Sequence, residues 1–315
     1  MKYLQQIITT GRLTLPIVVL LTALCWVGVY FVTPEPEALA GWSGRLLSFA
    51  SYLLIGYILI RLNNTYALIR RRASVQSSFF LLFVTACPLL HAFYPANVAT
   101  IMVLFAAFNL LKCYQSHRPM GNVLNTFMFL GVSSLIVPQF ALFVPVFLVG
   151  VLIISTLNFK TFIAAILGWV IPYWFLFSYA YFTENMELFY RPFTAMATFQ
   201  PLSLDNLDVA GLINIAYLFV VFLVSAFYFI INQSKEKIST RLYLSFISLL
   251  TFSIFLYILL QPAYALSMQL LLTTGVSVLA AHFFVLTNSR ASNLFFICTL
   301  LGLLLLFGYN VWMLL

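Results

Sequence analysis

The sequence predicts an all-α, polytopic transmembrane helix bundle, and three observations support this fold class. The first is composition: 63% of the 315 residues are hydrophobic and only 7% are charged, whereas a soluble domain has roughly 25% charged residues. The second is a series of long apolar stretches, and the third is the way the charges divide between the connecting loops. Such a chain cannot cover its core with polar surface, so the apolar excess must face lipid.

Eleven apolar stretches are long enough to cross ~30 Å of hydrocarbon as helices. In chain order they are residues 14–33, 46–62, 79–95, 97–113, 121–138, 140–157, 161–183, 209–232, 242–260, 263–286 and 293–313. Two pairs, 79–95 with 97–113 and 121–138 with 140–157, have almost no linker, so ten or twelve spans remain alternatives. Pro95 and Pro138 supply the breaks in these pairs. No long polar linker interrupts the series, which predicts a single integral membrane domain over residues 1–315.

Two further features of these stretches carry expectations. Residues 14–33 are longer than the apolar region of a signal peptide and no small-x-small cleavage site follows, so we expect a retained helix. Three prolines inside the stretches, Pro88, Pro145 and Pro172, are expected to kink their helices. The four cysteines lie in or at the ends of the stretches and are expected to pack as small apolar side chains.

The charged residues predict the orientation of the chain, because Lys and Arg near helix ends stay on the cytoplasmic side. With the N-terminus inside, 13 of the 15 basic residues lie in the cytoplasm, and six of the seven acidic residues lie outside. The exceptions are Arg45 and Arg191 outside and Glu236 inside. We therefore expect a cytoplasmic N-terminus and a periplasmic C-terminus. Because the basic residues form no polar, foldable patch, nucleic acid is not an expected partner.

The candidate site residues lie in two external loops, 34–45 and 184–208, of which the second is the longest external segment. Three carboxylates are candidate catalytic bases or ligands of a divalent cation, and no other cofactor is expected: Glu35, Glu37 and Glu184. Arg45 and Arg191 are candidate phosphate-binding residues, because a guanidinium pairs bidentately with phosphate, and Tyr190 adjoins Arg191. The alternative is that these arginines pair with neighbouring carboxylates and that the acids only enforce topology.

Inside the predicted spans, the polar residues are mostly uncharged. Asn109, Asn125, Asn214, Gln269 and Asn310 are expected to form hydrogen bonds between helices. No carboxylate lies at mid-membrane depth, where ion-coupled transporters usually place one, and only His91 and His282 are titratable imidazoles close to spans. Walker, Rossmann, H-E-x-x-H and G-x-S-x-G motifs are absent, which argues against the chemistries they serve.

Residues 154–182, ISTLNFKTFIAAILGWVIPYWFLFSYAYF, resemble an uncharacterised family of polytopic inner-membrane proteins of the Bacteroidota. The resemblance rests on a short turn with Asn158 and Lys160 that leads into a helix bearing Gly168, Pro172 and Tyr173, and in hydropathy it extends along most of the chain. It implies a bacterial inner-membrane location and no reaction. The alternative is that Lys160, Gly168 and Pro172 mark only a tight turn, a close helix contact and a kink.

A second resemblance concerns topology. With an acidic first external loop, the chain is similar to polytopic glycosyltransferases that use polyprenyl-phosphate sugars, and Arg191 in a late external loop is similar to O-antigen polymerases and ligases. This implies cell-envelope lipid or glycan handling, by glycosyl transfer from a polyprenyl phosphate or by glycolipid translocation, with a polar periplasmic site. The expected partners are the lipid bilayer and a polyprenyl-phosphate or glycolipid. The alternative is a non-catalytic membrane subunit, a scaffold or a small-molecule transporter.

Overall fold

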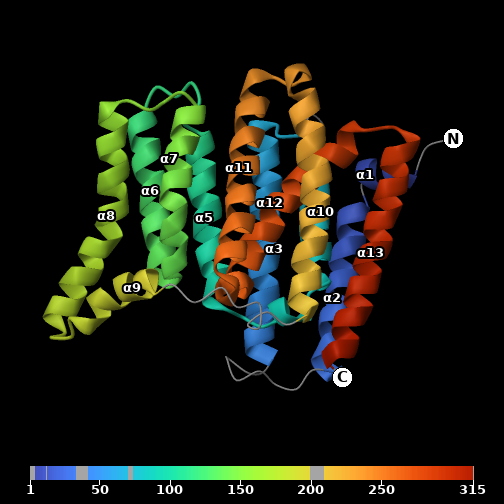
Figure 1. Ribbon diagram of the computed structural model, residues 1–315, viewed down its shortest axis with the longest axis horizontal. Helices are drawn as coiled ribbons and strands as arrows, with labels where there is room; N and C mark the ends of the chain where they lie inside the picture. The colour runs from blue at the N-terminus through green and yellow to red at the C-terminus, as the bar shows by residue number, and fades with distance from the viewer. Residues whose placement is uncertain (1–3, 12, 33–41, 70–73, 199–208, 315) are drawn as a thin grey trace. The chain divides into compact units, whose positions relative to one another are not determined.

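The computed structural model describes residues 4–11, 13–32, 42–69, 74–198 and 209–314, and within these ranges the chain is helical with no strand (Figure 1). Eight helices are long and apolar enough to cross a membrane. They are α2 (Thr14–Val32), α3 (Trp42–Tyr66), α6 (Pro119–Ile136), α8 (Phe159–Phe182), α10 (Val209–Asn232), α11 (Ile238–Leu260), α12 (Ala265–Leu286) and α13 (Arg290–Leu314). The all-α, multi-pass architecture predicted from composition is therefore confirmed.

Three of the expected spans correspond to apolar helices that are shorter than the eight above. Residues 79–95 correspond to α4 (Val75–Thr85) and the 3-10 helix η1 (Pro88–His91), and residues 97–113 correspond to α5 (Pro95–Leu111). Residues 140–157 correspond to η2 (Pro138–Phe143) and α7 (Val144–Ile153). Eight spans are thus supported by length and composition, while the count of eleven and the orientation stay predictions.

Short elements complete the described chain. They are α1 (Leu4–Thr10), α9 (Glu187–Ala197), η4 (Gln233–Lys235) and η5 (Pro262–Tyr264). Helix α9 lies inside the segment expected to be a loop, 184–208, of which residues 199–208 lie outside the described ranges. The apolar stretch thus ends at α8, and an amphipathic helix follows it.

The prolines act mainly as starting residues of helices. Pro88 and Pro145 each occupy the first turn of an element, η1 and α7 respectively, so the expectation that they kink a span is wrong. Proline is tolerated in the first turn because its missing N–H has no intrahelical partner there. Pro172 lies inside α8, as expected.

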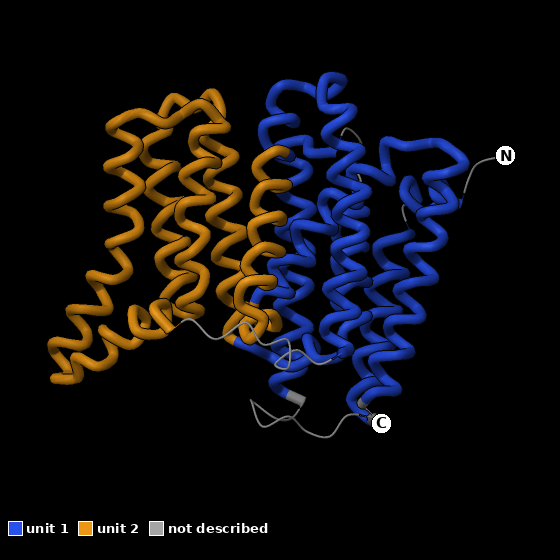
Figure 2. Tube along the Cα trace, in the orientation of Figure 1, with its two compact units in different colours: residues 1–94, 204–244, 268–315 blue, residues 95–203, 245–267 orange. Residues whose placement is uncertain are grey.

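The chain forms two compact units (Figure 2). Unit 1 comprises residues 1–94, 204–244 and 268–315, and unit 2 comprises residues 95–203 and 245–267. In unit 1, α4 packs against α2, α3 and α13, and ten of its eleven residues are buried. Ser77 Oγ on α4 donates to Gly56 O at 2.7 Å and Gln76 Nε2 donates to Leu59 O at 3.2 Å, which joins α4 to α3. The element that ends at the break before η1 is therefore central to unit 1.

In unit 2, α8 packs closely on α6. A Cβ atom at Gly168 would lie 2.4 Å from the carbonyl oxygen of Leu124, and one at Gly131 would lie 2.9 Å from Pro172 Cγ. Helix α8 begins with a capping box, in which the Asn158 side chain accepts from Thr161 N at 2.9 Å. These contacts agree with the interpretation of residues 154–182 as a turn, a close helix contact and a proline inside a helix.

Candidate functional site

The candidate site residues predicted from the sequence fall in both units. Arg45 lies in the first turn of α3 in unit 1. Tyr190 and Arg191 are exposed on α9 in unit 2, and Glu184 is exposed just after α8 with a φ of 52°. Glu35 and Glu37 lie outside the described residues. Unit 1 therefore holds Arg45, and unit 2 holds the other described candidates.

Arg45 is buried, with only 9% of its surface exposed. Its guanidinium carbon lies 4.8 Å from the centroid of the Tyr30 ring on α2, a cation–π contact that stabilises a desolvated cation by about 2 kcal/mol. His91, the last residue of η1, lies close enough to Arg45 for an electrostatic interaction. Arg45, one of the two arginines that oppose the positive-inside pattern, thus lies where α2, α3 and η1 meet.

Two stacked rings complete this cluster. The ring of Trp26 on α2 stacks on His91, with centroids 3.6 Å apart and an interplanar angle of 13°. Both side chains are buried, and neither Trp26 Nε1 nor either ring nitrogen of His91 has a hydrogen-bond partner among the described residues. Carbonyls of Val84 and Thr85 lie near the imidazole without hydrogen-bond geometry. A buried polar group without a partner costs about 1–3 kcal/mol, so these nitrogens favour a bound polar ligand or water.

Helix α3 also fixes η1 itself. Tyr52 donates its hydroxyl proton to Leu90 O, and Ser48 Oγ donates to Ala92 O at 3.3 Å. Ser48 and Tyr52 follow Arg45 by three and seven residues, so the three side chains share one face of α3. That face holds both the guanidinium and the backbone of η1. We call Trp26, Tyr30, Arg45 and His91 the arginine cluster.

Amide side chains surround the other side of the break between α4 and η1. Asn214 Nδ2 on α10 and Gln269 Nε2 on α12 donate to Cys87 Sγ at 3.6 and 3.5 Å. Asn310 Nδ2 on α13 donates to Asn214 Oδ1 at 3.1 Å and to Ala86 O at 2.6 Å. The predicted hydrogen bond between helices is confirmed for Asn214 and Asn310, whereas Gln269 bonds to Cys87 in the break between α4 and η1.

The amide of Asn109 in unit 2 behaves differently. Asn109 Nδ2 donates to Phe105 O of its own helix at 2.9 Å, so the prediction of a bond between helices is wrong for Asn109.

A cavity of about 30 Å³ lies beside the amides of unit 1, lined by Cys87, Pro88, Asn214 and Asn310 among others. A water molecule fits such a volume and finds polar partners there.

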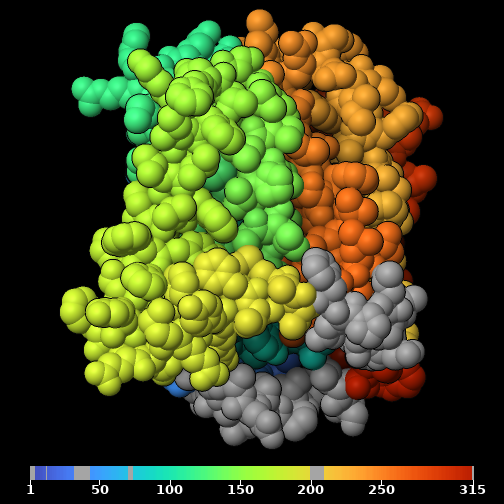
Figure 3. Space-filling model, turned by 60° about the vertical axis from the view of Figure 1, so that its left-hand side comes forward, coloured from blue at the N-terminus to red at the C-terminus, as the bar shows by residue number. Residues whose placement is uncertain are grey.

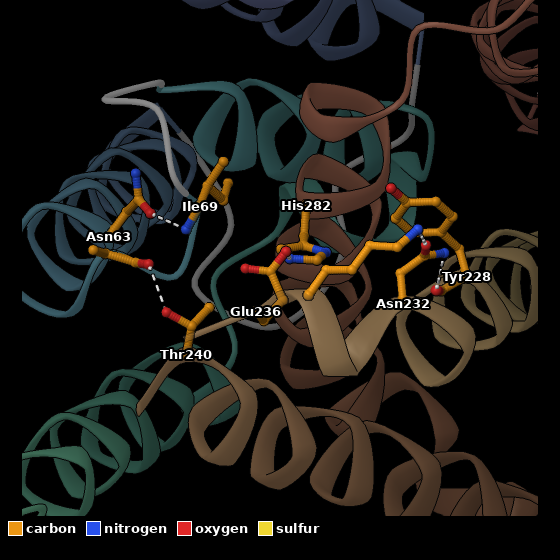
Figure 4. A network of polar contacts seen from close by, with 9 residues as sticks. Asn63, Ile69, Tyr228, Asn232, Glu236, Thr240 and His282 are labelled. Carbon is orange, nitrogen blue, oxygen red and sulfur yellow. Dashed lines mark hydrogen bonds and ion pairs between the residues drawn. The ribbon is translucent and has the colours of Figure 1, made fainter. Parts of the chain in front are cut away.

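Unit 1 contains a second buried polar site, shown in Figure 4. His282 Nε2 on α12 lies 3.9 Å from Glu236 Oε1, and both side chains are buried. Around them, Thr240 Oγ1 donates to Ala67 O at 3.3 Å and Asn63 Oδ1 accepts from Ile69 N at 2.8 Å. Sequence reasoning marked Glu236 as the one acidic residue on the cytoplasmic side but could not pair it with a histidine 46 positions away.

The described residues contain no cluster of three or more His, Cys, Asp or Glu side chains that could hold a metal ion. The suggested divalent cation at Glu35, Glu37 and Glu184 therefore stays a prediction, because two of these residues lie outside the described ranges.

Sequence reasoning missed Trp26 and the pairing of His91 with Arg45. The available signal was weak: His91 was one of two imidazoles close to spans, and Pro88 three residues earlier marked a break. Nothing in the sequence places Trp26 on the same cluster, because that depends on how α2 packs against η1.

Long apolar helices with buried polar clusters define a multi-pass membrane protein. Comparison of the chain with protein-family models, with curated proteins and with solved structures finds no match. The geometry of the buried clusters is therefore the basis on which a function is assigned.

Proposed function

We propose that this membrane protein handles a phosphate-bearing lipid or glycolipid of the bacterial cell envelope, and that the arginine cluster binds the phosphate. The observation that carries the proposal is the burial of Arg45 beside Trp26 and His91, whose ring nitrogens have no partner among the described residues. Phosphate oxygens accept hydrogen bonds from a guanidinium in a bidentate manner. The indole and imidazole N–H groups supply further donors.

The surroundings of the cluster favour an amphiphile over free phosphate. Helices α2 and α3 are apolar and of membrane-spanning length, so a ligand that reaches Arg45 along them has a hydrocarbon portion that remains in lipid. In the orientation predicted from the charges, the α2–α3 connection faces the periplasm of a bacterial inner membrane. The external loop that carries Glu35 and Glu37 directly precedes α3.

This arrangement suits glycosyl transfer from a polyprenyl phosphate. Glycolipid translocation is the alternative that uses the same phosphate site without breaking a bond. In transfer, a carboxylate takes the proton of the acceptor hydroxyl, and the hydroxyl oxygen forms a bond to the anomeric carbon of the sugar. The bond from that carbon to the phosphate oxygen breaks, and the polyprenyl phosphate leaves. Arg45 would stabilise the charge on the departing phosphate. Glu35 and Glu37 are the candidate bases of this proposal, while Glu184, Tyr190 and Arg191 stay separate predictions for unit 2.

The test is native mass spectrometry of the detergent-purified protein, with identification of the lipid that remains bound. Arg45→Gln should reduce retention of a phosphate-bearing polyprenyl lipid or glycolipid at least tenfold. Arg61→Gln is the matched control, because Arg61 is also on α3 with its guanidinium carbon 5.6 Å from a tyrosine ring centroid, yet it is exposed. Equal retention by Arg45→Gln and Arg61→Gln would overturn the proposal.

A second variant separates ligand binding from folding. Trp26→Phe keeps a ring for stacking on His91 and removes the Nε1 donor that has no partner among the described residues, together with part of the indole ring. If that N–H serves a ligand, the variant should lower lipid retention several-fold, whereas a lower thermal midpoint of the delipidated protein reports only the lost ring volume. Retention of bulk phospholipid only, unchanged in both variants, would instead support a non-catalytic subunit, a scaffold or a small-molecule transporter.

A further inference from the structure

Unit 2 carries a groove on the flank of two apolar helices. It has a volume of about 510 Å³ and lies between the η2–α7 segment, through Leu142, Phe143 and Val146, and the end of α11, through Leu256 and Leu260. Figure 3 shows α7 in green beside α11 in orange, with α9 in yellow next to them. This volume lies within the range of roughly 300–1,000 Å³ that is typical of small-molecule sites.

Polar side chains gather at one end of this groove. A second, smaller recess shares Leu142, Tyr257 and Gln261 with the groove and adds Gln139, Thr198 and Tyr264. Gln139 and Gln261 are both buried. The last turn of α9 contributes Ala195 and Met196 to the same recess. The combined site therefore has an apolar body and a polar end.

The chemistry of the polar end selects among ligands. None of the described residues that line either recess is charged, so a phosphate head would lose its hydration without gaining a cationic partner among them. Glutamine amides and tyrosine hydroxyls instead offer both donors and acceptors to a neutral head. Helix α11 is of membrane-spanning length and apolar, so the body of the groove opens toward hydrocarbon.

We propose that this groove binds one long hydrocarbon chain of a lipid whose head is uncharged and forms hydrogen bonds through a hydroxyl or carbonyl group. The chain lies against Leu142, Val146 and Leu256, and the head lies at Gln139, Tyr257 and Gln261. The few polar groups orient the ligand, and the apolar walls supply most of its affinity. This site shares no residue with the arginine cluster, and its ligand head differs in charge.

The experiment uses photoactivatable probes on the full-length protein in nanodiscs. A diazirine-bearing monoacylglycerol is the neutral probe, and a lysophosphatidic acid with the same chain is the charged probe. Peptide mapping should place the neutral label on residues 142–146 and 253–261, with at least fivefold less label from the charged probe. Label spread evenly over the exposed helices, or equal label from both probes, would overturn the proposal.

Matched variants sharpen the test. Leu256→Trp fills the groove and should reduce labelling about tenfold, whereas Leu259→Trp, on an exposed position of the same helix outside the groove, should leave it unchanged. Gln139→Leu with Gln261→Leu should lower labelling by the neutral probe several-fold, because the neutral head loses its amide partners. Similar labelling of the two tryptophan variants would contradict the site.

Two further arms identify the lipid and separate this inference from the proposed function. Competition by an unlabelled polyprenol would assign an isoprenoid chain, and competition by an unlabelled monoacylglycerol would assign an acyl chain; competition by neither would overturn the proposal. Arg45→Gln should leave labelling of the groove unchanged. Failure of the arginine cluster as a phosphate site therefore does not affect this result.

Discussion

The broken helix α4–η1 of unit 1 and the helix pair α6–α8 of unit 2 bury their backbones in different ways. In the α6–α8 pair the helices are continuous, and Gly131 and Gly168 allow the backbones to approach closely. At α4–η1 the helix stops, and side chains donate to the carbonyls that it leaves: Asn310 to Ala86, Tyr52 to Leu90 and Ser48 to Ala92. A continuous helix needs only small residues at its contacts, whereas a broken helix at membrane depth recruits polar side chains.

The same contrast extends to the buried ionisable side chains. Among the described residues, the buried arginine and histidines, Arg45, His91 and His282, all belong to unit 1. The buried polar side chains described in unit 2 are Ser, Thr, Asn and Gln, together with the Tyr173 hydroxyl and the Cys113 thiol, and none of them is basic. Unit 1 thus offers groups for an anionic head, and unit 2 offers a groove for a neutral one.

The largest effect on stability is expected in unit 2, for Gly168→Ala. The new methyl group would lie 2.4 Å from the carbonyl oxygen of Leu124, which is backbone and cannot rotate away. Overpacking of this kind costs about 1–3 kcal/mol, measured as a lower thermal unfolding midpoint in detergent. Gly308→Ala on α13 is the control, because among the described residues no atom beyond the adjacent backbone of its own helix lies within 4 Å of its added Cβ. Equal midpoints for the two variants would break the description of α6–α8 as a glycine-dependent contact.

The contrast between the two regions also explains what the sequence predicts and what it does not. The bounds of α10, 209–232, match the apolar run residue for residue, because a continuous apolar helix shows in hydropathy alone. Helix α4 starts four residues before the expected span and ends at Thr85, because hydropathy cannot distinguish a buried, broken helix from a crossing one. Arg45 was identifiable from its charge against the positive-inside pattern.

The sequence does not predict contacts between segments that are far apart along the chain. The stacking of Trp26 on His91 joins residues 65 positions apart, and no local pattern specifies it. Helix α9 falls in a segment whose charges and polarity suggest a loop, and its packing of Phe193 on Tyr173 of α8, with ring centroids 5.2 Å apart, stabilises it. In both cases tertiary packing decides the outcome.

A smaller loss of stability is expected for Asn310→Leu at the broken helix. The variant removes the donor to Ala86 O and to Asn214 Oδ1, and hydrogen bonds between helices in membranes contribute about 0.6–1.7 kcal/mol. Thermal unfolding of the two proteins in the same detergent measures the difference. Asn109→Leu is the control in unit 2, because its amide bonds only within its own helix. If Asn109→Leu proved the more damaging change, the contrast between the regions would be wrong.

The Glu236–His282 pair tests whether the side chains of the second polar site of unit 1 are energetically coupled. The two side chains are buried with Nε2 and Oε1 3.9 Å apart, so we expect a coupling energy of about 0.5–1 kcal/mol. A double-mutant cycle with Glu236→Gln and His282→Gln measures it by thermal or chemical unfolding. His117→Gln, at an exposed position in unit 2, should combine additively with Glu236→Gln. Additive effects in both cycles would show that Glu236 and His282 are not coupled.

The last prediction concerns the chemical reactivity of the Cys113 thiol, which lies in unit 2 just after α5. Burial disfavours the charged thiolate and raises the pKa of the Cys113 thiol to about 12. The thiol donates to Asn109 O at 3.4 Å. At pH 8 its thiolate fraction should therefore be far below that of an ordinary thiol, and alkylation by iodoacetamide should be slow until the protein unfolds.

The alkylation experiment also bears on the comparison of the two units. Peptide mapping after labelling at pH 8, with the denatured protein as the fully reactive control, reports how tightly the end of α5 is enclosed. If Cys113 reacted in the folded protein as fast as an ordinary thiol of pKa about 8.5, water would reach this part of unit 2. The description of the end of α5 as enclosed would then be wrong, and the contrast with the polar side chains at the α4–η1 break would weaken.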